Sequence, residues 1–141
     1  MTIFAALTLL ATGCALLPWA TPPNPLIGTW SNTDNDRVTF QADAVLVTPN
    51  KGTPTAMGPG DCNGVFRIAY GRMDTAPFAS LFPGQPDLEE KLKGLLVQPQ
   101  YPVAEVTCDK GGTTYFMIDD RDLLAIYRDA GVGGLERLTR L

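Results

Sequence analysis

The stretch VAEVTCDKGGTTYFMIDDRDLLAIYR, residues 103–128, contains three runs rich in Val, Ile, Thr, Phe and Tyr, separated by two short polar segments. The segments DKGG at 109–112 and DDRD at 119–122 hold Asp and Gly residues, which favour tight turns. Short apolar runs joined by such turns are typical of neighbouring antiparallel strands. The stretch therefore predicts a meander with strands over residues 103–108, 113–118 and 123–128.

The same pattern continues on both sides of this meander. Further strand candidates lie at residues 29–31, 37–41, 44–48, 65–70 and 135–139. Several of them alternate, so that Val38 and Phe40 share one face of their strand. The 14 glycines and 12 prolines in 141 residues favour short elements joined by turns over long helices. The sequence predicts a mainly β domain over residues 26–141, a small antiparallel up-and-down β-barrel of about eight strands, closed or nearly closed.

One short helix is expected within this domain. Asp87 stands three positions before a glutamate, which is a capping-box arrangement that predicts the start of the helix at Asp87. Leu88, Leu92, Leu95 and Leu96 then follow at helical spacing. We expect this leucine face to pack over an opening of the barrel, with a partner-binding surface as the alternative.

An apolar leader precedes the domain. Residues 3–12 are uncharged and apolar, which matches a signal-peptide core and falls short of the roughly 20 residues that span a bilayer. Behind them, Ala11-Thr12-Gly13-Cys14 resembles a bacterial lipobox. The resemblance implies that residues 1–13 are a lipoprotein signal peptide and that Cys14 carries the lipid. Two alternatives stay open: cleavage at a small residue such as Ala20, giving a soluble exported protein, and retention of the leader as a short anchor.

The segment after Cys14 and the remaining cysteines fit an exported protein. Residues 14–25 contain four prolines and predict an extended tether, because proline fixes φ and lacks an N–H donor. The chain has three cysteines. If Cys14 is lipidated, Cys62 and Cys108 remain to form a disulfide in an oxidising compartment, which would stabilise the fold by on the order of 4 kcal/mol. The alternative is two buried free thiols in a cytosolic protein.

Composition argues against several classes of function. The chain has no histidine, so histidine-based triads and the usual Cys/His zinc sites are absent; we expect no enzyme, no metal and no cofactor, although paired carboxylates leave glycoside chemistry open. The formal charge of −4 argues against nucleic acid as a partner. Residues 32–36, NTDND, resemble the start of a calcium loop, but Arg37 replaces the required glycine. A polar hairpin turn is the favoured interpretation of this segment.

A family resemblance lies at the two ends of the domain. Gly28-Thr29-Trp30 in the first strand, together with a basic residue late in the last strand, Arg137 or Arg140, resembles the calycin pattern of lipocalins and their small bacterial relatives. The resemblance implies a lipocalin-like barrel in which Trp30 packs across the closed end beneath an arginine. It also brings ligand binding into consideration.

Two function classes follow from these observations. We expect a non-catalytic structural, interaction or inhibitor-type lipoprotein of the cell envelope, lipid-anchored, facing the periplasm, and at the outer rather than the inner membrane; the alternative location is a secreted soluble protein. The alternative function is a lipocalin-like binder of a small apolar or amphipathic ligand. The candidate contacts with a ligand or protein partner are Phe66, Ile68, Tyr115 and Ile126 in the barrel wall, and Phe78 and Phe82 in the apolar loop at 77–86, where they are expected to be exposed.

Overall fold

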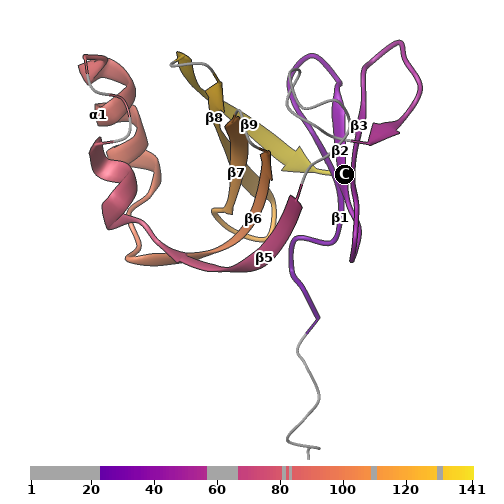
Figure 1. Ribbon diagram of the computed structural model, residues 1–141, viewed down its shortest axis with the longest axis horizontal. Helices are drawn as coiled ribbons and strands as arrows, with labels where there is room; N and C mark the ends of the chain where they lie inside the picture. The colour runs from indigo at the N-terminus through magenta and orange to yellow at the C-terminus, as the bar shows by residue number, and fades with distance from the viewer. Residues whose placement is uncertain (1–22, 57–66, 81, 83, 109–110, 130–131) are drawn as a thin grey trace, which may run out of the picture.

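Nine antiparallel strands, one α-helix and one 3₁₀ helix make up the part of the chain that the computed structural model describes, residues 23–56, 67–80, 82, 84–108, 111–129 and 132–141 (Figure 1). The strands are β1 Gly28–Ser31, β2 Arg37–Phe40, β3 Val45–Thr48, β4 Thr55–Ala56, β5 Arg67–Asp74, β6 Gln100–Cys108, β7 Gly111–Met117, β8 Asp122–Asp129 and β9 Val132–Arg140. The 3₁₀ helix η1 is Ala76–Ser80 and the α-helix α1 is Pro86–Leu95. The prediction of a mainly β fold with one helix is confirmed.

The strands form one sheet in the order β4-β3-β2-β1-β9-β8-β7-β6-β5. Two meanders, β1 to β4 and β5 to β9, are joined where Trp30 and Ser31 of β1 lie opposite Arg140 and Thr139 of β9. The sheet curls into a half-barrel (Figure 1). Its edge strands β4 and β5 are not paired with each other in the described residues, so the antiparallel barrel that the sequence predicts is observed as an open, curled sheet.

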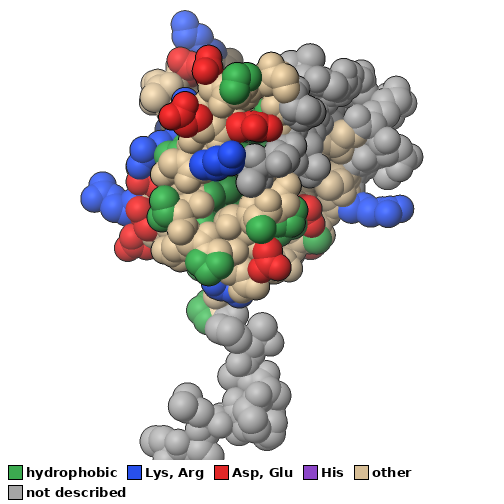
Figure 2. Space-filling model, turned by 90° about the vertical axis from the view of Figure 1, so that its left-hand side faces the viewer, with side chains coloured by type: hydrophobic (Ala, Val, Ile, Leu, Met, Phe, Trp, Pro, Cys, Tyr) green, Lys and Arg blue, Asp and Glu red, His purple; other side chains and the backbone are tan. Residues whose placement is uncertain are grey.

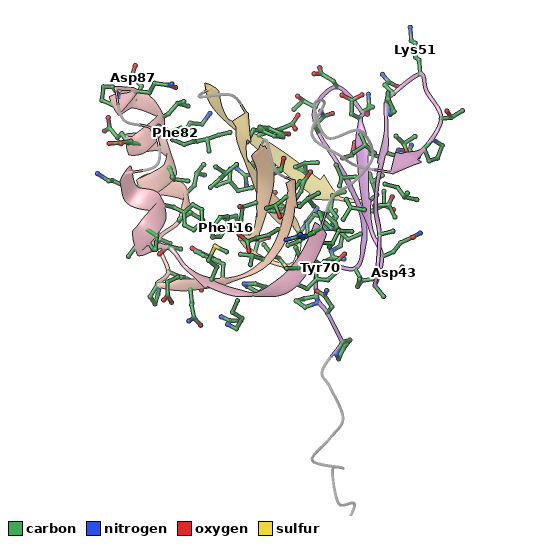
Figure 3. All side chains as sticks on the ribbon, in the orientation of Figure 1. Asp43, Lys51, Tyr70, Phe82, Asp87 and Phe116 are labelled. Atoms are coloured by element: carbon green, nitrogen blue, oxygen red, sulfur yellow. The ribbon has the colours of Figure 1, made fainter. Side chains whose placement is uncertain are left out.

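Side chains bridge part of the open side of this sheet. The Tyr70 hydroxyl, on edge strand β5, donates a hydrogen bond to the carbonyl of Gln41, which follows β2. The Tyr70 ring also meets Phe40 edge to face, with 6.5 Å between ring centroids. Figure 3 shows Tyr70 of β5 on the side toward Asp43. These contacts hold β5 near the β2–β3 hairpin without a strand ladder.

The concave face of the sheet is filled by the protein's own side chains. Trp30 is fully buried there, in one cluster with Phe40 and Tyr115. Phe116 is also fully buried, but it lies on the opposite face of the sheet. Phe40 and Tyr115 pack edge to face at 5.0 Å between centroids. The remaining buried members of this inner core are Leu26, Val38, Val45, Ala104, Val106, Leu123, Ala125 and Leu138. Burial of these side chains supplies the main driving force for closing the half-barrel.

A second core covers the outer face of β6 to β9. Here Phe116 packs edge to face against Phe78 of η1 at 4.8 Å and against Tyr101 at 6.4 Å. Leu92 of α1 is 1% exposed in the same cluster, with Leu88 partly buried beside it. In Figure 1, β6 to β9 stand between α1 on one side and β1 to β3 on the other. The expectation that α1 covers a barrel opening is wrong: it packs on the outside of the wall, because alternate residues of β6 to β8 are apolar on that side too.

The start of α1 also differs from the prediction. The helix begins at Pro86, its N-cap is Gln85, and no side chain caps it. Asp87 therefore lies inside the first turn and is not the cap. Proline is favoured at the first helical position, where its missing N–H would have no helical partner and its φ already suits the helix. Among the described residues, no helix is both long enough and apolar enough to cross a bilayer.

Gly133 offers a test of the outer core. A Cβ atom at this position in β9 would overlap the ring of Phe82, which is 3% exposed. Gly133→Ala is therefore expected to lower the free energy of unfolding by about 1 to 3 kcal/mol through overpacking, measured by urea denaturation. Gly71→Ala in β5 is the matched control, because nothing lies within 4 Å of its added Cβ. Equal stability of the two variants would contradict the packing of Phe82 against β9.

Candidate functional site

One end of the half-barrel is closed around Trp30 and Arg140. The Arg140 Cζ lies 4.1 Å from the centroid of the Trp30 ring, within the range of a cation–π interaction. Its guanidinium donates from Nη2 to the Pro25 carbonyl at 2.6 Å, from Nη1 to that of Ile27 at 3.3 Å and from Nε to that of Asp120 at 2.8 Å. The Trp30 Nε1 donates to the Leu26 carbonyl at 3.0 Å. The structure thus brings Arg140, of the two candidate arginines, over Trp30.

Arg137 lies elsewhere. Its Nη2 forms a salt bridge of 2.6 Å with the Asp122 carboxylate, and the hydrogen bond and charge of Asp122 raise the pKa of Arg137. Successive residues of a strand point to opposite faces, so Arg137 cannot share the inner row of Arg140. Each of the three guanidinium nitrogens of Arg140 donates to a backbone carbonyl, so Arg140 ties the segment before β1 and the turn before β8 to the end of β9.

The two arginines therefore differ in their expected contribution to stability. Arg140→Ala is expected to lower the free energy of unfolding by about 1 to 3 kcal/mol, because it removes the contact with the Trp30 ring and three charge-assisted hydrogen bonds to backbone carbonyls. Arg137→Ala removes a solvent-exposed ion pair and is expected to change stability little. Chemical denaturation of the two variants tests this difference. A larger loss from Arg137→Ala would overturn the assignment of Arg140 as the closing residue.

Farther along the inner face, a pocket of about 270 Å³ remains between β2, β3, β7, β8 and β9. We call it the mouth pocket. Its lining residues are Asn32, Asp36, Val38, Val47, Pro49, Tyr115, Tyr127, Glu136 and Leu138. Strand register explains its walls: Tyr115 lies between Ala104 and Ala125, and Tyr127 between Thr113 and Gly134. Small neighbours on both sides leave room for the two phenol rings on the concave surface.

A hydrogen-bond network lines the mouth pocket. The Asn32 Nδ2 amide donates to Glu136 Oε1 at 2.7 Å and to Asp36 Oδ2 at 3.3 Å. The Tyr127 hydroxyl donates to Glu136 Oε2, and the backbone N–H of Asn50 donates to Asp36 Oδ1 at 2.9 Å. Two negative side chains of half-buried residues are thus held by the same asparagine.

Residues 32–36, which resemble the start of a calcium-binding loop, form the hairpin turn between β1 and β2. The Asn32 side-chain oxygen accepts hydrogen bonds from the backbone N–H groups of Asp34 and Asp36 at 3.0 and 2.9 Å. Asn35 adopts a left-handed φ of 65°, which asparagine tolerates better than most residues. Among the described residues, no group of three or more His, Cys, Asp or Glu side chains is placed to hold a metal ion.

The two tyrosines of the mouth pocket make the stability of the folded protein depend on pH. Burial, and next the nearby charge of Glu136, raise the pKa of Tyr115, although a hydrogen bond with Thr113 opposes this. Burial and then the hydrogen bond to Glu136 raise the pKa of Tyr127. Above about pH 10 the two phenols ionise in the unfolded chain but stay protonated in the folded protein. The free energy of unfolding is therefore unaffected by them below about pH 10. Above that pH it decreases, by up to about 1.4 kcal/mol per pH unit for each tyrosine.

Urea unfolding between about pH 8 and pH 11 measures this loss. Tyr127→Phe is expected to reduce the slope of stability against pH above about pH 10, because phenylalanine has no proton to lose in either state. An unchanged slope in that variant would show that Tyr127 does not contribute.

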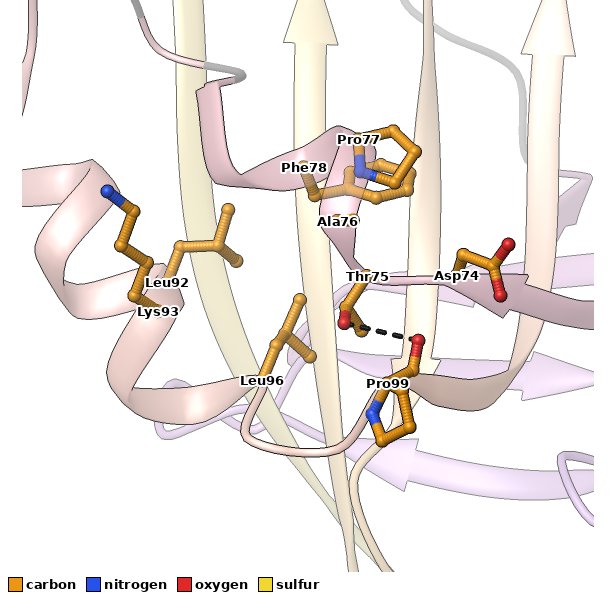
Figure 4. A pocket seen from close by; sticks show the side chains of 9 residues that line it. All are labelled: Asp74, Thr75, Ala76, Pro77, Phe78, Leu92, Lys93, Leu96 and Pro99. Carbon is orange, nitrogen blue, oxygen red and sulfur yellow. Dashed lines mark hydrogen bonds between the residues drawn. The ribbon is translucent and has the colours of Figure 1, made fainter.

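A second hollow lies outside the barrel, between η1, the C-terminal half of α1 and the segment leading into β6. This helix groove has a volume of about 470 Å³. Figure 4 shows its lining: Asp74, Thr75, Ala76, Pro77, Phe78, Leu92, Lys93, Leu96 and Pro99. Most of these side chains are apolar, while Lys93 stands at one side and Asp74 at the other (Figure 4). The Thr75 Oγ1 donates to the carbonyls of Gln98 and Pro99 at 2.8 and 3.3 Å, which fixes the floor of the groove.

The predicted contact residues are divided between the two cores. Tyr115 is buried in the inner core and Ile68 packs partly against it. Ile126, expected on the barrel interior, lies in the outer core instead, because it is one residue out of phase with Ala125. Phe78 and Phe82, expected to be exposed, are only 6% and 3% exposed. They fill the space between α1 and the sheet, where Figure 3 shows Phe82 and Phe116.

Three predicted residues lie outside what the structure describes. Cys14, Cys62 and Phe66 are not among the described residues, and of Cys108 only the backbone, at the end of β6, is described. The lipid attachment and the Cys62–Cys108 disulfide therefore stay predictions.

Sequence reasoning missed the polar groups of the mouth pocket. Glu136 and Leu138 are two residues apart in the predicted strand at 135–139, so they had to share a face. A carboxylate in the same row as a core leucine was the signal for a polar site inside the barrel.

Comparison with models of protein families, with curated proteins and with solved structures gave no match. The fold and the site are therefore interpreted from the residues themselves.

Proposed function

We propose that this protein is a non-catalytic lipoprotein of the bacterial cell envelope that acts as a structural, interaction or inhibitor-type module. The observation that carries the proposal is that the concave face is occupied by the protein's own core. Trp30, Phe40 and Tyr115 are each at most 1% exposed there, and about 270 Å³ remains in the mouth pocket. That volume is below the usual 300 to 1,000 Å³ or so of sites for drug-sized ligands. Such a barrel is suited to presenting a surface rather than to carrying a lipid.

Membrane attachment is proposed from the sequence. The lipobox-like segment ending at Cys14 would provide the anchor, and residues 14–25 the tether that holds the domain at the periplasmic side of the outer membrane. Arg140 binds the Pro25 carbonyl, which supports a domain boundary immediately after the tether. In the oxidising periplasm Cys62 and Cys108 would form a disulfide. A secreted soluble form is the alternative if the leader is cleaved elsewhere.

The accessible surface around α1 is compatible with protein contacts. Figure 2 views the molecule from the α1 side and shows Lys and Arg side chains interspersed with Asp and Glu, with hydrophobic side chains between them. Interfaces between proteins commonly combine apolar and mixed polar groups in this way.

The ligand-binding alternative is supported by the helix groove rather than by the barrel. Its volume of about 470 Å³ and its lining by Phe78, Leu92 and Leu96 fit a small apolar or amphipathic molecule. Lys93 at one side would favour a ligand with an acidic end.

Mass spectrometry of the protein purified from its own envelope tests both functions. We expect denaturing spectra to show diacylglycerol on the parent protein, and to lose it in Cys14→Ser. Under native conditions we expect the bare lipoprotein or its complex with another envelope protein. An apolar or amphipathic molecule that survives native conditions and leaves on denaturation would refute the interaction function in favour of the binder; Leu96→Trp, which fills the helix groove, would then abolish that extra mass.

A further inference from the structure

The mouth pocket brings two acidic side chains together, and no basic side chain of the described residues lines it. Asp36 and Glu136 each place an oxygen within hydrogen-bond distance of the same Asn32 nitrogen. No Lys or Arg is among the pocket's described lining residues, and the salt bridge found in the described chain, Arg137 with Asp122, lies elsewhere. Repulsion between like charges is screened less in a half-buried pocket than in water. A bound cation would relieve it.

The donors already present leave acceptor capacity for such a cation. Asn32, Tyr127 and the Asn50 backbone together donate one described hydrogen bond to each of the four carboxylate oxygens. Each ionised carboxylate can accept about four hydrogen bonds, so these described donors use about half of the capacity of each. An ammonium group has three donors in its –NH₃⁺ form, which suits two carboxylates that face one space.

The walls of the pocket select an organic cation over a metal ion. Tyr115 and Tyr127 supply aromatic rings, while Val38, Val47 and Leu138 supply aliphatic surface. Aromatic rings attract ammonium groups through cation–π interactions, and the aliphatic side chains would pack against an alkyl stem. A hard metal ion such as Ca²⁺ requires about six to eight oxygen ligands, and the described residues provide no cluster of three acidic or other metal-binding side chains.

The sequence context of Glu136 supports a binding role. Register places Glu136 in the inner row with Ala125, Tyr115 and Ala104, positions that otherwise build the core. A carboxylate in such a row breaks the pattern that stabilises the fold, and exceptions of this kind are expected at functional sites.

We infer that the mouth pocket binds a primary alkylammonium group, presented either by a small amine or by a lysine side chain of a partner. The pocket's volume of about 270 Å³ admits an alkylammonium of a few carbons and excludes a lipid. This inference is independent of the proposed function, because a free amine would bind whether or not the protein has an envelope partner.

The test is a titration of the folded full-length protein with n-butylammonium chloride, followed by NMR chemical shifts and by calorimetry, with n-butanol as the neutral probe of similar size. We expect saturable binding of the ammonium ion, with chemical-shift changes at Tyr127 and Glu136. The affinity for butanol is expected to be lower by roughly tenfold or more, because butanol lacks the charge-assisted hydrogen bonds. Glu136→Gln and Asp36→Asn should each lower the affinity for the ammonium ion roughly tenfold or more. Glu90→Gln, which removes the same charge from an exposed position on α1, should leave binding unchanged.

Near-UV circular dichroism establishes that each variant is folded. If only one of Glu136→Gln and Asp36→Asn folds, that variant alone is compared with the unmodified protein. A peptide with one central lysine distinguishes the two sources of the cation. Tighter binding of the peptide than of butylammonium assigns a partner's side chain, and equal or weaker binding assigns a small amine. Non-saturable binding, equal affinity for butanol, or full affinity in a folded Glu136→Gln and a folded Asp36→Asn variant would overturn the inference.

Discussion

Replacing Trp30 by alanine is expected to lower the free energy of unfolding by about 3 to 5 kcal/mol, the largest loss of any single substitution in the inner core. Trp30 is 0% exposed, and its removal leaves a cavity that the surrounding strands fill only in part. The variant also leaves the Leu26 carbonyl without its indole donor and the Arg140 guanidinium without its ring. Small domains are stable by about 5 to 15 kcal/mol, so Trp30→Ala is expected to be largely unfolded on mild heating.

Urea denaturation followed by far-UV circular dichroism measures this loss. Val97→Ala is the control, because Val97 is 77% exposed and its truncation creates no cavity. Trp30→Phe separates the two contributions, since it keeps most of the apolar volume and removes the indole N–H. A Trp30→Ala variant as stable as Val97→Ala would refute the closed end of the half-barrel.

Phe116→Ala is expected to have an effect of similar size on the opposite face of the sheet. Phe116 is 0% exposed and packs against Phe78 and Tyr101, so its removal leaves a cavity between η1 and β7. The expected loss is again about 3 to 5 kcal/mol. Hydrogen exchange measured by NMR should show the amides of α1 exchanging faster in this variant, because Leu92 of α1 belongs to the same buried cluster as Phe116.

The two losses are expected to add, because Trp30 and Phe116 belong to separate cores on opposite faces of the sheet. A double variant in a chemically stabilised background, such as an osmolyte solution, measures this additivity. Strong coupling between the two positions would contradict the division into two cores.

Most of the strands could be predicted from the sequence because each is a short apolar run between turn residues. The predicted strands at 123–128 and 135–139 lie inside β8 and β9, which extend farther at both ends. The two-residue strand β4, Thr55–Ala56, was missed, since a run of that length has no periodicity. β5 continues to Asp74, four residues past the predicted end, because pairing with β6 overrides the weak strand preference of glycine.

The orientation of side chains was harder to predict than the strands. In the run Leu123 to Ile126 four successive residues are buried, so alternation does not show which residues face the barrel. Such a continuous apolar run is itself the sign of a strand covered on both faces, and it would have placed α1 outside the barrel wall. The sequence predicts an apolar surface loop at 77–86 with Phe78 and Phe82 exposed, whereas both rings are buried against the apolar outer face of the sheet.

The candidate site was predictable to a similar degree. The pairing of Trp30 with a late arginine was implied by the resemblance to the calycin pattern, and strand parity distinguishes Arg140 from Arg137. The mouth pocket depends on Asn32, Asp36 and Glu136, which are brought together across 104 residues of sequence by the pairing of β1 with β9. No local sequence pattern predicts that these three side chains are close together, because their proximity depends on which strands become neighbours.

The position of β9 in the middle of the sheet has a consequence for how the chain folds. β9 pairs with β8 from Val132 to Thr139 and with β1 at Arg140 and Thr139, and no other strands of the two meanders are paired in the described sheet. During synthesis the ribosome must complete residues 132–140 before β1 acquires its second neighbour. Until then the β1 to β4 meander stays separate, and Trp30 remains without the arginine that covers it. The concave core is therefore assembled only once residues 132–140 have been synthesised, in a slow step that closes a loop of about one hundred residues.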